Sequence, residues 1–383
     1  MYRLNPQQQE LATRAGAIAD DKIAPHAARS DQNAEFVRPG ITALGEQGFL
    51  GLSVPAEFGG MAQGLRTVAA VLEEVAQRDA STAMVYLMHM CGIACYSAAP
   101  GKTGTLLRLA AAGKHLSTLA FSETGSRSHF WAPVSKAADE NGRIRIAAKK
   151  SFVTSAGQAD GYVVSTGDAK GSQPLESTIY FTLSSDAGVA SNGTWSGVGM
   201  RGNSSAPMTF NVLVDADRAL TEPGKGLDMM LGIVLPLFQV GSAAIGVGIS
   251  EASVRATQAH LTSSRLEHQN KTLAELPTLR ARLAEMRVET DKSRAHLAAV
   301  LDSLESPGPM TQLLVLEVKG AATEAAVRVT DLAMRTCGGA AFGGAYGLER
   351  RFRDARAPII MAPTTDQAYD IIGRALCGLE LLS

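Results

Sequence analysis

Glycine and arginine residues near the C-terminus offer binding chemistry for an anionic ligand. Gly338-Gly339 lets another backbone or a ligand approach closely, because no Cβ intervenes. Arginines in this part of the chain carry a guanidinium, a group that forks well onto phosphate oxygens. Within the segment Arg353–Gly373, the short loop Met361-Ala362-Pro363-Thr364 has no side chain that can take a proton. These residue types suit the binding of a ligand, whereas the loop offers no side chain for general-base catalysis.

The same stretch resembles the C-terminal signature of the acyl-CoA dehydrogenase family. That family has a diglycine at a helix end, a Glu-Arg…Arg-Asp-Ala-Arg run, and a Tyr-Glu-Gly-Thr loop that carries the catalytic glutamate. Glu349-Arg350 and Arg353-Asp354-Ala355-Arg356 match the run. The loop departs from the pattern, because Ala362 stands where the base is expected.

Two upstream segments resemble the flavin-binding loops of this family. Leu119–Ser128 is similar to its Thr-Glu-Pro-Gly-Ala-Gly-Ser-Asp loop, although Thr124, Arg127 and His129 replace the proline, the second glycine and the aspartate. Lys150–Ser155 is similar to its Lys-x-Trp-Ile-Thr-Asn strand. The two matches come in the family's order along the chain, and Gly199–Ser205 follows them.

The resemblance implies FAD as the cofactor and assigns residues to it. An isoalloxazine needs an aromatic or apolar wall, a hydroxyl or amide near N5, and donors at its pyrimidine end. Phe152 would form the wall in place of the family's tryptophan, and Thr154 would hydrogen-bond near N5. Ser122 would face the pyrimidine end, with Phe121 in the same set of contacts. Ser128 would approach the pyrophosphate or the substrate's pantetheine.

Other cofactor contacts are implied for the C-terminal part. Arg265 stands where the family's Arg-x-x-Phe-Gly motif supplies a guanidinium to the FAD pyrophosphate of a neighbouring subunit. Gly338 and Gly339 would approach the adenosine half of that FAD. Thr364 matches the threonine beside the flavin, and Asp366 occupies the next polar contact position. The expected assembly is therefore a homodimer or homotetramer, or a heteromer with a partner chain.

The missing base leaves the catalytic residue unassigned. The family removes an α-proton with a carboxylate while the β-hydride goes to flavin N5. Some members place the carboxylate on the first helix of the C-terminal bundle, a position that aligns with Phe238. General-base catalysis is worth about 10²–10⁴-fold, so the loss matters. His129, Glu251 and Asp366 are candidates for a base at another position.

Three interpretations remain. We adopt an FAD-dependent, acyl-CoA dehydrogenase-like oxidoreductase that acts on the Cα–Cβ bond of an acyl thioester, with its base at another position. The first alternative is a reduced-flavin-dependent monooxygenase on the same fold, which needs no α-proton base. The second is a non-catalytic subunit of a heteromeric acyl-CoA dehydrogenase. The sequence does not specify the acyl chain length or the electron acceptor. It also does not specify whether CoA or an acyl carrier protein carries the acyl group.

The elements that position these residues begin with a helical part, residues 1–113. Asn5-Pro6 predicts a helix start, with a capping side chain followed by proline at the first helical position. This helix is expected to end near Pro25, and helices at 39–48, 65–78 and 81–98 follow. The segment Met84–Tyr96 is apolar nearly all round and is expected to be central.

The middle and C-terminal parts have different periodicities. Residues 114–221 show period-two alternation and turn residues, including Asn141-Gly142, which predicts a β-barrel or sandwich domain. Residues 222–383 are expected to form a four-helix bundle. Its helices are expected at 227–262, 276–304, 311–336 and 365–381. The predicted fold class is α+β, similar to acyl-CoA dehydrogenases.

Composition gives further expectations about partners and location. Of the 383 residues, Lys and Arg number 36 against 37 for Asp and Glu, so the charge balance indicates neither nucleic acid nor an anionic membrane as a partner. The cysteines show no Cys-x-x-Cys spacing, so no metal site is expected, and they fit a reducing cytoplasm. Residues 1–30 carry charges throughout and show no targeting signal.

One segment, Met229–Ile249, has about the length of a membrane-spanning helix of ~20 residues. Gln239 and Ser242 interrupt its apolar run, and Pro236 is expected to kink it. A helix buried on all sides in a large bundle gives the same pattern. We therefore expect a buried helix rather than a membrane span.

Overall fold

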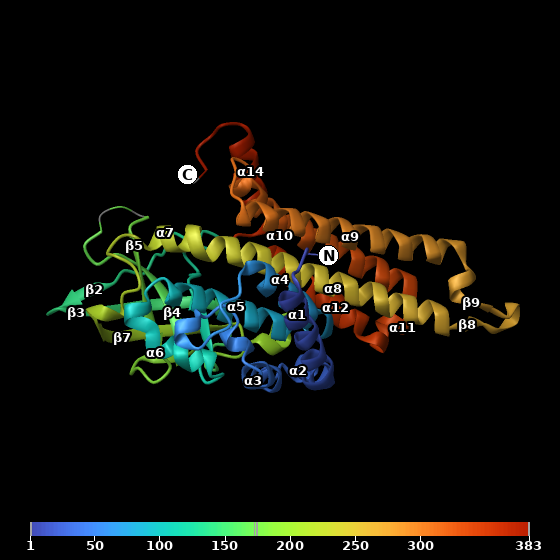
Figure 1. Cartoon of the computed structure of the whole chain (residues 1–383), viewed down its shortest axis with the longest axis horizontal. Coiled ribbons are helices and arrows are strands. Elements are labelled where there is room, and N and C mark those ends of the chain that lie inside the picture. The colour runs from blue at the N-terminus through green and yellow to red at the C-terminus, as the bar shows by residue number, and fades with distance from the viewer. Residues whose placement is uncertain (1, 172, 174, 382–383) are drawn as a thin grey trace.

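The structure of the protein is a computed structural model, and it describes residues 2–171, 173 and 175–381. A helical N-terminal part, a middle part of β-strands and a helical C-terminal part follow one another along the chain (Figure 1). The strands of the middle part lie at the left end in Figure 1, and the C-terminal helices extend to the right. This architecture confirms the predicted α+β fold.

The N-terminal helices are α1 (Pro6–Ile18), α2 (Ala24–Asn33), α3 (Arg38–Glu46), α4 (Leu65–Arg78), α5 (Ala80–Ser97) and α6 (Pro100–Ala111). Asn5 caps α1 as predicted, since its side chain accepts a hydrogen bond from Gln8 N at 2.9 Å. Helix α5 is central, also as predicted, and Tyr86, Leu87 and Met90 on it are fully buried.

The prediction that the first helix ends near Pro25 is wrong, because the chain stays helical to Asn33. A π-helical turn, Ala19–Ile23, joins α1 to α2. Pro25 therefore lies in the first turn of α2, where its missing N–H removes no helical hydrogen bond.

The middle part contains two sheets. In the first, β1 (Ser117–Ala120) runs parallel to β4 (Gly161–Gly167), and β4 pairs antiparallel with β5 (Ser177–Leu183). The second is antiparallel, in the order β2 (Ala138–Glu140), β3 (Arg143–Val153), β7 (Ala206–Asp215), β6 (Val189–Ser191). Asn141 and Gly142 form the predicted β2–β3 hairpin turn, and both have the positive φ, 57° and 84°, that a type I′ turn requires.

The long C-terminal helices are α8 (Leu235–Ser263), α9 (Pro277–Glu305) and α10 (Thr311–Cys337), which pack against one another. Helix α7 (Gly226–Met229) and a π-helical turn, Met230–Val234, lead into α8. The strands β8 (Arg265–Leu266) and β9 (Lys271–Thr272) join α8 to α9. The short helices α11 (Gly339–Phe342), α12 (Leu348–Asp354) and α13 (Ala357–Ile360) follow α10.

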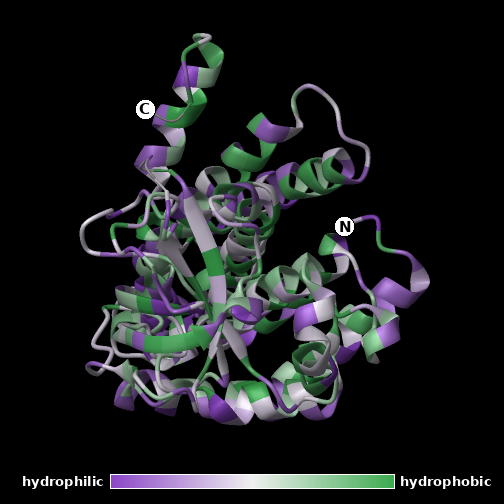
Figure 2. Cartoon of the chain, turned by 90° about the vertical axis from the view of Figure 1, so that its left-hand side faces the viewer, coloured by the Kyte–Doolittle hydropathy of each residue, from purple (hydrophilic) through white to green (hydrophobic). Residues whose placement is uncertain are grey.

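The last helix, α14 (Thr365–Leu376), packs on α10 and then projects from the rest of the protein (Figures 1 and 2). It ends five residues earlier than predicted. Gly378, with φ 68°, adopts the left-handed conformation that stops a helix.

The continuous helical segment Gly226–Ser263 is long and apolar enough to cross a membrane. However, 67% of its most apolar window is buried within the protein. Helices α4, α9 and α10 pack around α8, so its apolar side chains form the core that joins the N-terminal part to the C-terminal helices.

Candidate functional site

A cavity of about 1020 Å³ lies where the three parts of the chain meet. Its lining comes from α5, from the loops around β1, β3 and β7, from the start of α8, and from the segment between α12 and α14. The lining is mainly apolar, with hydroxyl, amide and guanidinium groups among the apolar side chains. Such a cavity suits a large ligand that has an aromatic part and a polar part.

Six of the residues assigned to the cofactor line this one cavity: Phe121, Ser122, Ser128, Phe152, Thr154 and Thr364. They come from three segments that are far apart in the sequence. The Thr154 hydroxyl is buried and lies 3.0 Å from the Ser205 hydroxyl. The Thr364 hydroxyl accepts a hydrogen bond from Gln367 N at 3.3 Å and so caps α14.

Phe152 has an unusual backbone and exposure for a large aromatic residue. The pairing of β3 with β7 shifts register between Lys150 and Val153, and Phe152 lies in this irregularity with φ 55°. A bulky residue rarely adopts the left-handed region, because its side chain is strained there. The ring is 69% exposed, lines the cavity and meets Trp195 edge-on at 6.5 Å. A strained, exposed aromatic ring in a cavity indicates a binding surface.

The loop that carries Ser122 and Ser128 is held from beneath by a buried ion pair. Lys150 Nζ lies 2.6 Å from Glu123 Oε1, and both side chains are almost fully buried. The other oxygen of Glu123 accepts hydrogen bonds from the Val134 and Ser135 backbone amides at 2.8 Å. Burial lowers the pKa of Lys150 to about 8, although Glu123 opposes the shift. Glu123 therefore serves the loop, and none of its oxygens is free to take a proton.

Several lining residues were not predicted as site residues. Asn203 is fully buried, and its side-chain Nδ2 has no hydrogen-bond partner among the described residues, so it offers a free donor to a ligand. Met84, Met88 and Trp195 add apolar surface. Of these residues, only Asn203 carried a signal in the sequence, because it lies in the Gly199–Ser205 segment.

Four of the assigned residues lie outside the cavity. Arg265 lies on β8, at the right end in Figure 1, and Gly338 and Gly339 lie where α10 ends and α11 begins, also to the right of the sheets of the middle part. The Arg265 guanidinium donates to Asn270 Oδ1 at 2.8 Å and is exposed. Asp366 is exposed in the first turn of α14 and does not line the cavity. Within one protomer, these residues do not join the other assigned contacts.

Both positions at which the family places its base do line the cavity. Ala362 and Phe238, the latter on α8, are both lining residues. Neither can take a proton. His129 packs against Trp131 at 5.2 Å and does not line the cavity.

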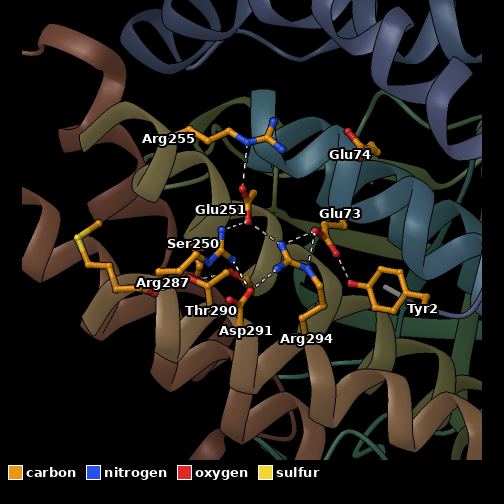
Figure 3. A network of polar contacts seen from close by, with 12 residues as sticks. Tyr2, Glu73, Glu74, Ser250, Glu251, Arg255, Arg287, Thr290, Asp291 and Arg294 are labelled. Atoms are coloured by element: carbon orange, nitrogen blue, oxygen red, sulfur yellow. Dashed lines mark hydrogen bonds and ion pairs between the residues drawn. The ribbon is translucent and has the colours of Figure 1, made fainter. Parts of the chain in front are cut away.

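Glu251 belongs to a different part of the protein, a charged cluster between α4, α8 and α9 (Figure 3). Arg294 Nη2 and Arg287 Nη1 each lie 2.8 Å from its Oε2, and Arg255 Nε lies 3.0 Å from its Oε1. Burial would raise the pKa of Glu251, but the hydrogen bonds from Arg294 and Arg287 prevail and lower it to about 2. The structure therefore brings none of the three candidate bases into the cavity.

Lys319 holds the loop that contains Ala362. Its ammonium group is buried and donates to Met361 O at 2.9 Å and to Pro363 O at 2.6 Å, the carbonyls on either side of Ala362. Burial lowers the pKa of Lys319 to about 7. A buried lysine that serves two carbonyls fixes the backbone of this loop against α10.

The Arg353-Asp354 pair joins all three parts of the chain at the cavity. Arg353 pairs with Asp31 of α2 through Nη1 at 2.9 Å, and it also donates to Val198 O at 3.0 Å. Asp354 is buried and accepts a hydrogen bond from Met200 N at 2.6 Å. Burial raises the pKa of Asp354 to about 7. This run of the sequence signature therefore has a structural role in closing the cavity.

Two sequence profiles match the chain: acyl-CoA dehydrogenase N-terminal domain over residues 5–102, and acyl-CoA dehydrogenase C-terminal domain over residues 224–377. The chain belongs to the acyl-CoA dehydrogenase family. This confirms the resemblance predicted from the sequence. The protein is an FAD-dependent oxidoreductase of this acyl-CoA dehydrogenase family.

Its relatives in this family cover nearly the whole chain. The cyclohex-1-ene-1-carbonyl-CoA dehydrogenase of Syntrophus aciditrophicus is 27% identical, over 98% of this chain and 91% of its own length. A probable acyl-CoA dehydrogenase of Bacillus subtilis is 26% identical, over 98% of this chain and 99% of its own length.

Solved structures show the same fold. The butyryl-CoA dehydrogenase of Megasphaera elsdenii superposes with a TM-score of 0.89 at 20% identity, over 98% of this chain and 99% of its own. KijD3, solved with FMN and a dTDP-linked sugar, superposes with a TM-score of 0.86 at 22% identity, over 98% of this chain and 95% of its own. This chain therefore shares its fold with both solved structures.

Proposed function

We propose that the cavity holds the isoalloxazine of FAD together with an acyl thioester, and that the protein oxidises the thioester at Cα–Cβ without a carboxylate at either usual base position. One observation carries this proposal: six residues assigned to the flavin from three distant segments line a single cavity with Ala362 and Phe238.

The described residues fit a flavin. Phe152 and Trp195 offer aromatic surface, the Thr154 and Ser205 hydroxyls form a polar edge, and Asn203 supplies an unpartnered donor. FAD supplies hydride acceptance when it is bound. The protein's own residues exclude water with apolar walls and orient the ligand with these donors.

Removal of the α-proton is the step that this chain supports least. The one carboxylate among the described lining residues is Glu123, and Lys150, Ser135 and Val134 occupy its oxygens. We therefore propose that the wild type dehydrogenates ordinary acyl-CoA slowly.

A reduced-flavin-dependent monooxygenase is the second candidate function. The observation that favours this function is that the described lining residues of the cavity offer no free base. Oxygen chemistry at reduced flavin does not begin with α-proton removal, so it needs none. A non-catalytic subunit that pairs with an active chain is the remaining alternative. The cytoplasmic location stays a prediction.

We also propose that the protein works as a dimer or tetramer. Arg265, Gly338 and Gly339 lie at the far end of the C-terminal helices from the cavity of their own protomer (Figure 1). They can serve FAD only if a second copy brings its cavity to that end. The exposed Arg265 guanidinium would then meet the partner's pyrophosphate.

The purified protein is expected to retain FAD, and Thr154→Val should lower its FAD affinity about 5- to 10-fold, as expected for one lost hydrogen bond. Thr182→Val is the matched control. Thr182 is buried in the same part of the chain, does not line the cavity and has no hydrogen-bond partner for its hydroxyl among the described residues. The measurement is quenching of FAD fluorescence on adding apoprotein. A wild type that binds neither oxidised nor reduced FAD would rule out the proposal.

Arg265→Glu is expected to weaken FAD retention about 100-fold, because it sets a carboxylate against a phosphate. Arg108→Glu, the same charge reversal on exposed α6, should retain FAD normally. Light scattering with absorbance at the flavin band gives mass and occupancy together. A monomer that holds FAD stoichiometrically would contradict the shared site.

A further inference from the structure

Arg127 stands in the Ser122–Ser128 loop with its side chain exposed and its backbone strained. It lines the cavity and has φ 49°, in the left-handed region that glycine adopts without cost. Hydrogen bonds to Glu123 O from Ser126 N at 3.2 Å and Arg127 N at 3.0 Å fix this turn. The loop thus holds a guanidinium at a point where glycine would be the residue of lower energy.

This guanidinium has no ionic partner among the residues that the structure describes. Glu123 is the one described carboxylate in the lining, and Lys150 with two residues of the next loop uses both of its oxygens. The other lining arginines differ from Arg127. Arg353 is neutralised by Asp31, and Arg356 lies over the Phe352 ring and donates to its carbonyl.

Two hydroxyls accompany Arg127 at this edge of the cavity. Thr124 and Ser128 both line it, and neither side chain has a hydrogen-bond partner among the described residues. A planar guanidinium forks onto two oxygens of one phosphate, and neighbouring hydroxyls can donate to the remaining oxygens. This grouping suits a ligand with adjacent phosphates better than one with a single small anion.

We propose that Arg127 binds the diphosphate group of a nucleotide ligand in the cavity, with the Ser128 hydroxyl beside it. The inference rests on the proposed function, in which both ligands, FAD and coenzyme A, carry a diphosphate. Either diphosphate offers the same chemistry to the guanidinium. Binding also explains why an arginine is kept at positive φ, since the ion pair offsets the backbone strain.

The test compares Arg127→Gly, Arg127→Lys and Arg127→Gln with the wild type in the full-length protein. Glycine suits φ 49°, so Arg127→Gly should unfold at the same temperature as the wild type or higher. Loss of binding in this variant therefore cannot be assigned to misfolding. Arg29→Gln removes an equal charge from exposed α2 and is the matched control.

Two ligands are titrated separately at several NaCl concentrations: FAD into apoprotein, and coenzyme A into FAD-loaded protein. We expect Arg127→Gly and Arg127→Gln to weaken the binding of one of these ligands about 10- to 100-fold, and to make its affinity depend less on salt. Arg127→Lys keeps the charge, so its loss of affinity should be smaller. Weakened FAD binding assigns Arg127 to the flavin diphosphate. Weakened coenzyme A binding with normal FAD assigns it to the substrate.

Unchanged affinity for both ligands in Arg127→Gly at low salt would overturn the inference and leave the proposed function intact. A wild type that binds neither ligand would overturn both.

Discussion

Ala362→Glu is expected to raise the rate of acyl-CoA dehydrogenation about 10²–10⁴-fold, the usual contribution of a general base. Ala362 lines the cavity in the loop where relatives of this fold are expected to carry their glutamate. Lys319 donates hydrogen bonds to the carbonyls of Met361 and Pro363, so the loop backbone should keep its position when glutamate replaces Ala362. The measurement is the rate of flavin reduction by acyl-CoA under anaerobic conditions.

Ala362→Gln is the control for this gain, because it has the same size but cannot take a proton. Pro363 restricts residue 362 to extended conformations, so Ala362→Glu with Pro363→Gly tests whether the loop points the new carboxylate wrongly. Phe238→Glu tests the second family position in the same cavity. If none of these carboxylates raises the rate above the glutamine control, the cavity does not place a substrate α-carbon at either position.

Arg294→Met is expected to destabilise the protein by about 3–5 kcal/mol, because it leaves buried carboxylates without their counter-charge. Arg294 is 4% exposed and donates to Glu73 and Glu251 at 2.8 Å each (Figure 3). The Tyr2 hydroxyl also donates to Glu73, so the cluster ties the N-terminus to α4 and α9. Denaturant unfolding followed by circular dichroism measures the change.

The matched control is Arg255→Met, which removes an arginine that pairs with the same Glu251. The Arg255 side chain is 62% exposed, so we expect a loss of about 1 kcal/mol or less. Equal losses of unfolding free energy in Arg255→Met and Arg294→Met would show that burial does not determine how much each arginine stabilises the fold.

Glu251 in the same cluster is expected to contribute to the acid sensitivity of the fold. The pKa of Glu251 in the folded protein is lowered from 4.5 to about 2. A lowered carboxyl pKa stabilises the fold above the unfolded value, and this stabilisation is lost as the pH falls through the folded value. The stability gap between wild type and Glu251→Gln should therefore narrow between pH 4.5 and about 2.

Local chemistry made much of the fold predictable from the sequence. The Asn5 cap and the Asn141-Gly142 turn depend on neighbouring residues only, and both lie where they were predicted. The helix end near Pro25 was missed because a π-helical turn moved the proline into a new first turn, which no local pattern indicated.

The site was predictable where a motif carried its residues and unpredictable where packing alone brought them together. Phe152 and Thr154, which a motif carries, both line the cavity. Lys319 lies 42 residues from Met361 in the sequence, so its contact with the loop arises only from the packing of α10. Glu251 was a candidate base in the sequence, but Arg287 and Arg294 from another helix form ion pairs with its carboxylate.

The most direct measurement is an anaerobic titration of the FAD-loaded wild type with short-, medium- and long-chain acyl-CoAs, followed by flavin absorbance. We expect a spectral shift on binding, followed by flavin bleaching that is slower in the wild type than in Ala362→Glu. Bleaching in the wild type as fast as in Ala362→Glu, or no spectral response to any acyl-CoA, would contradict it.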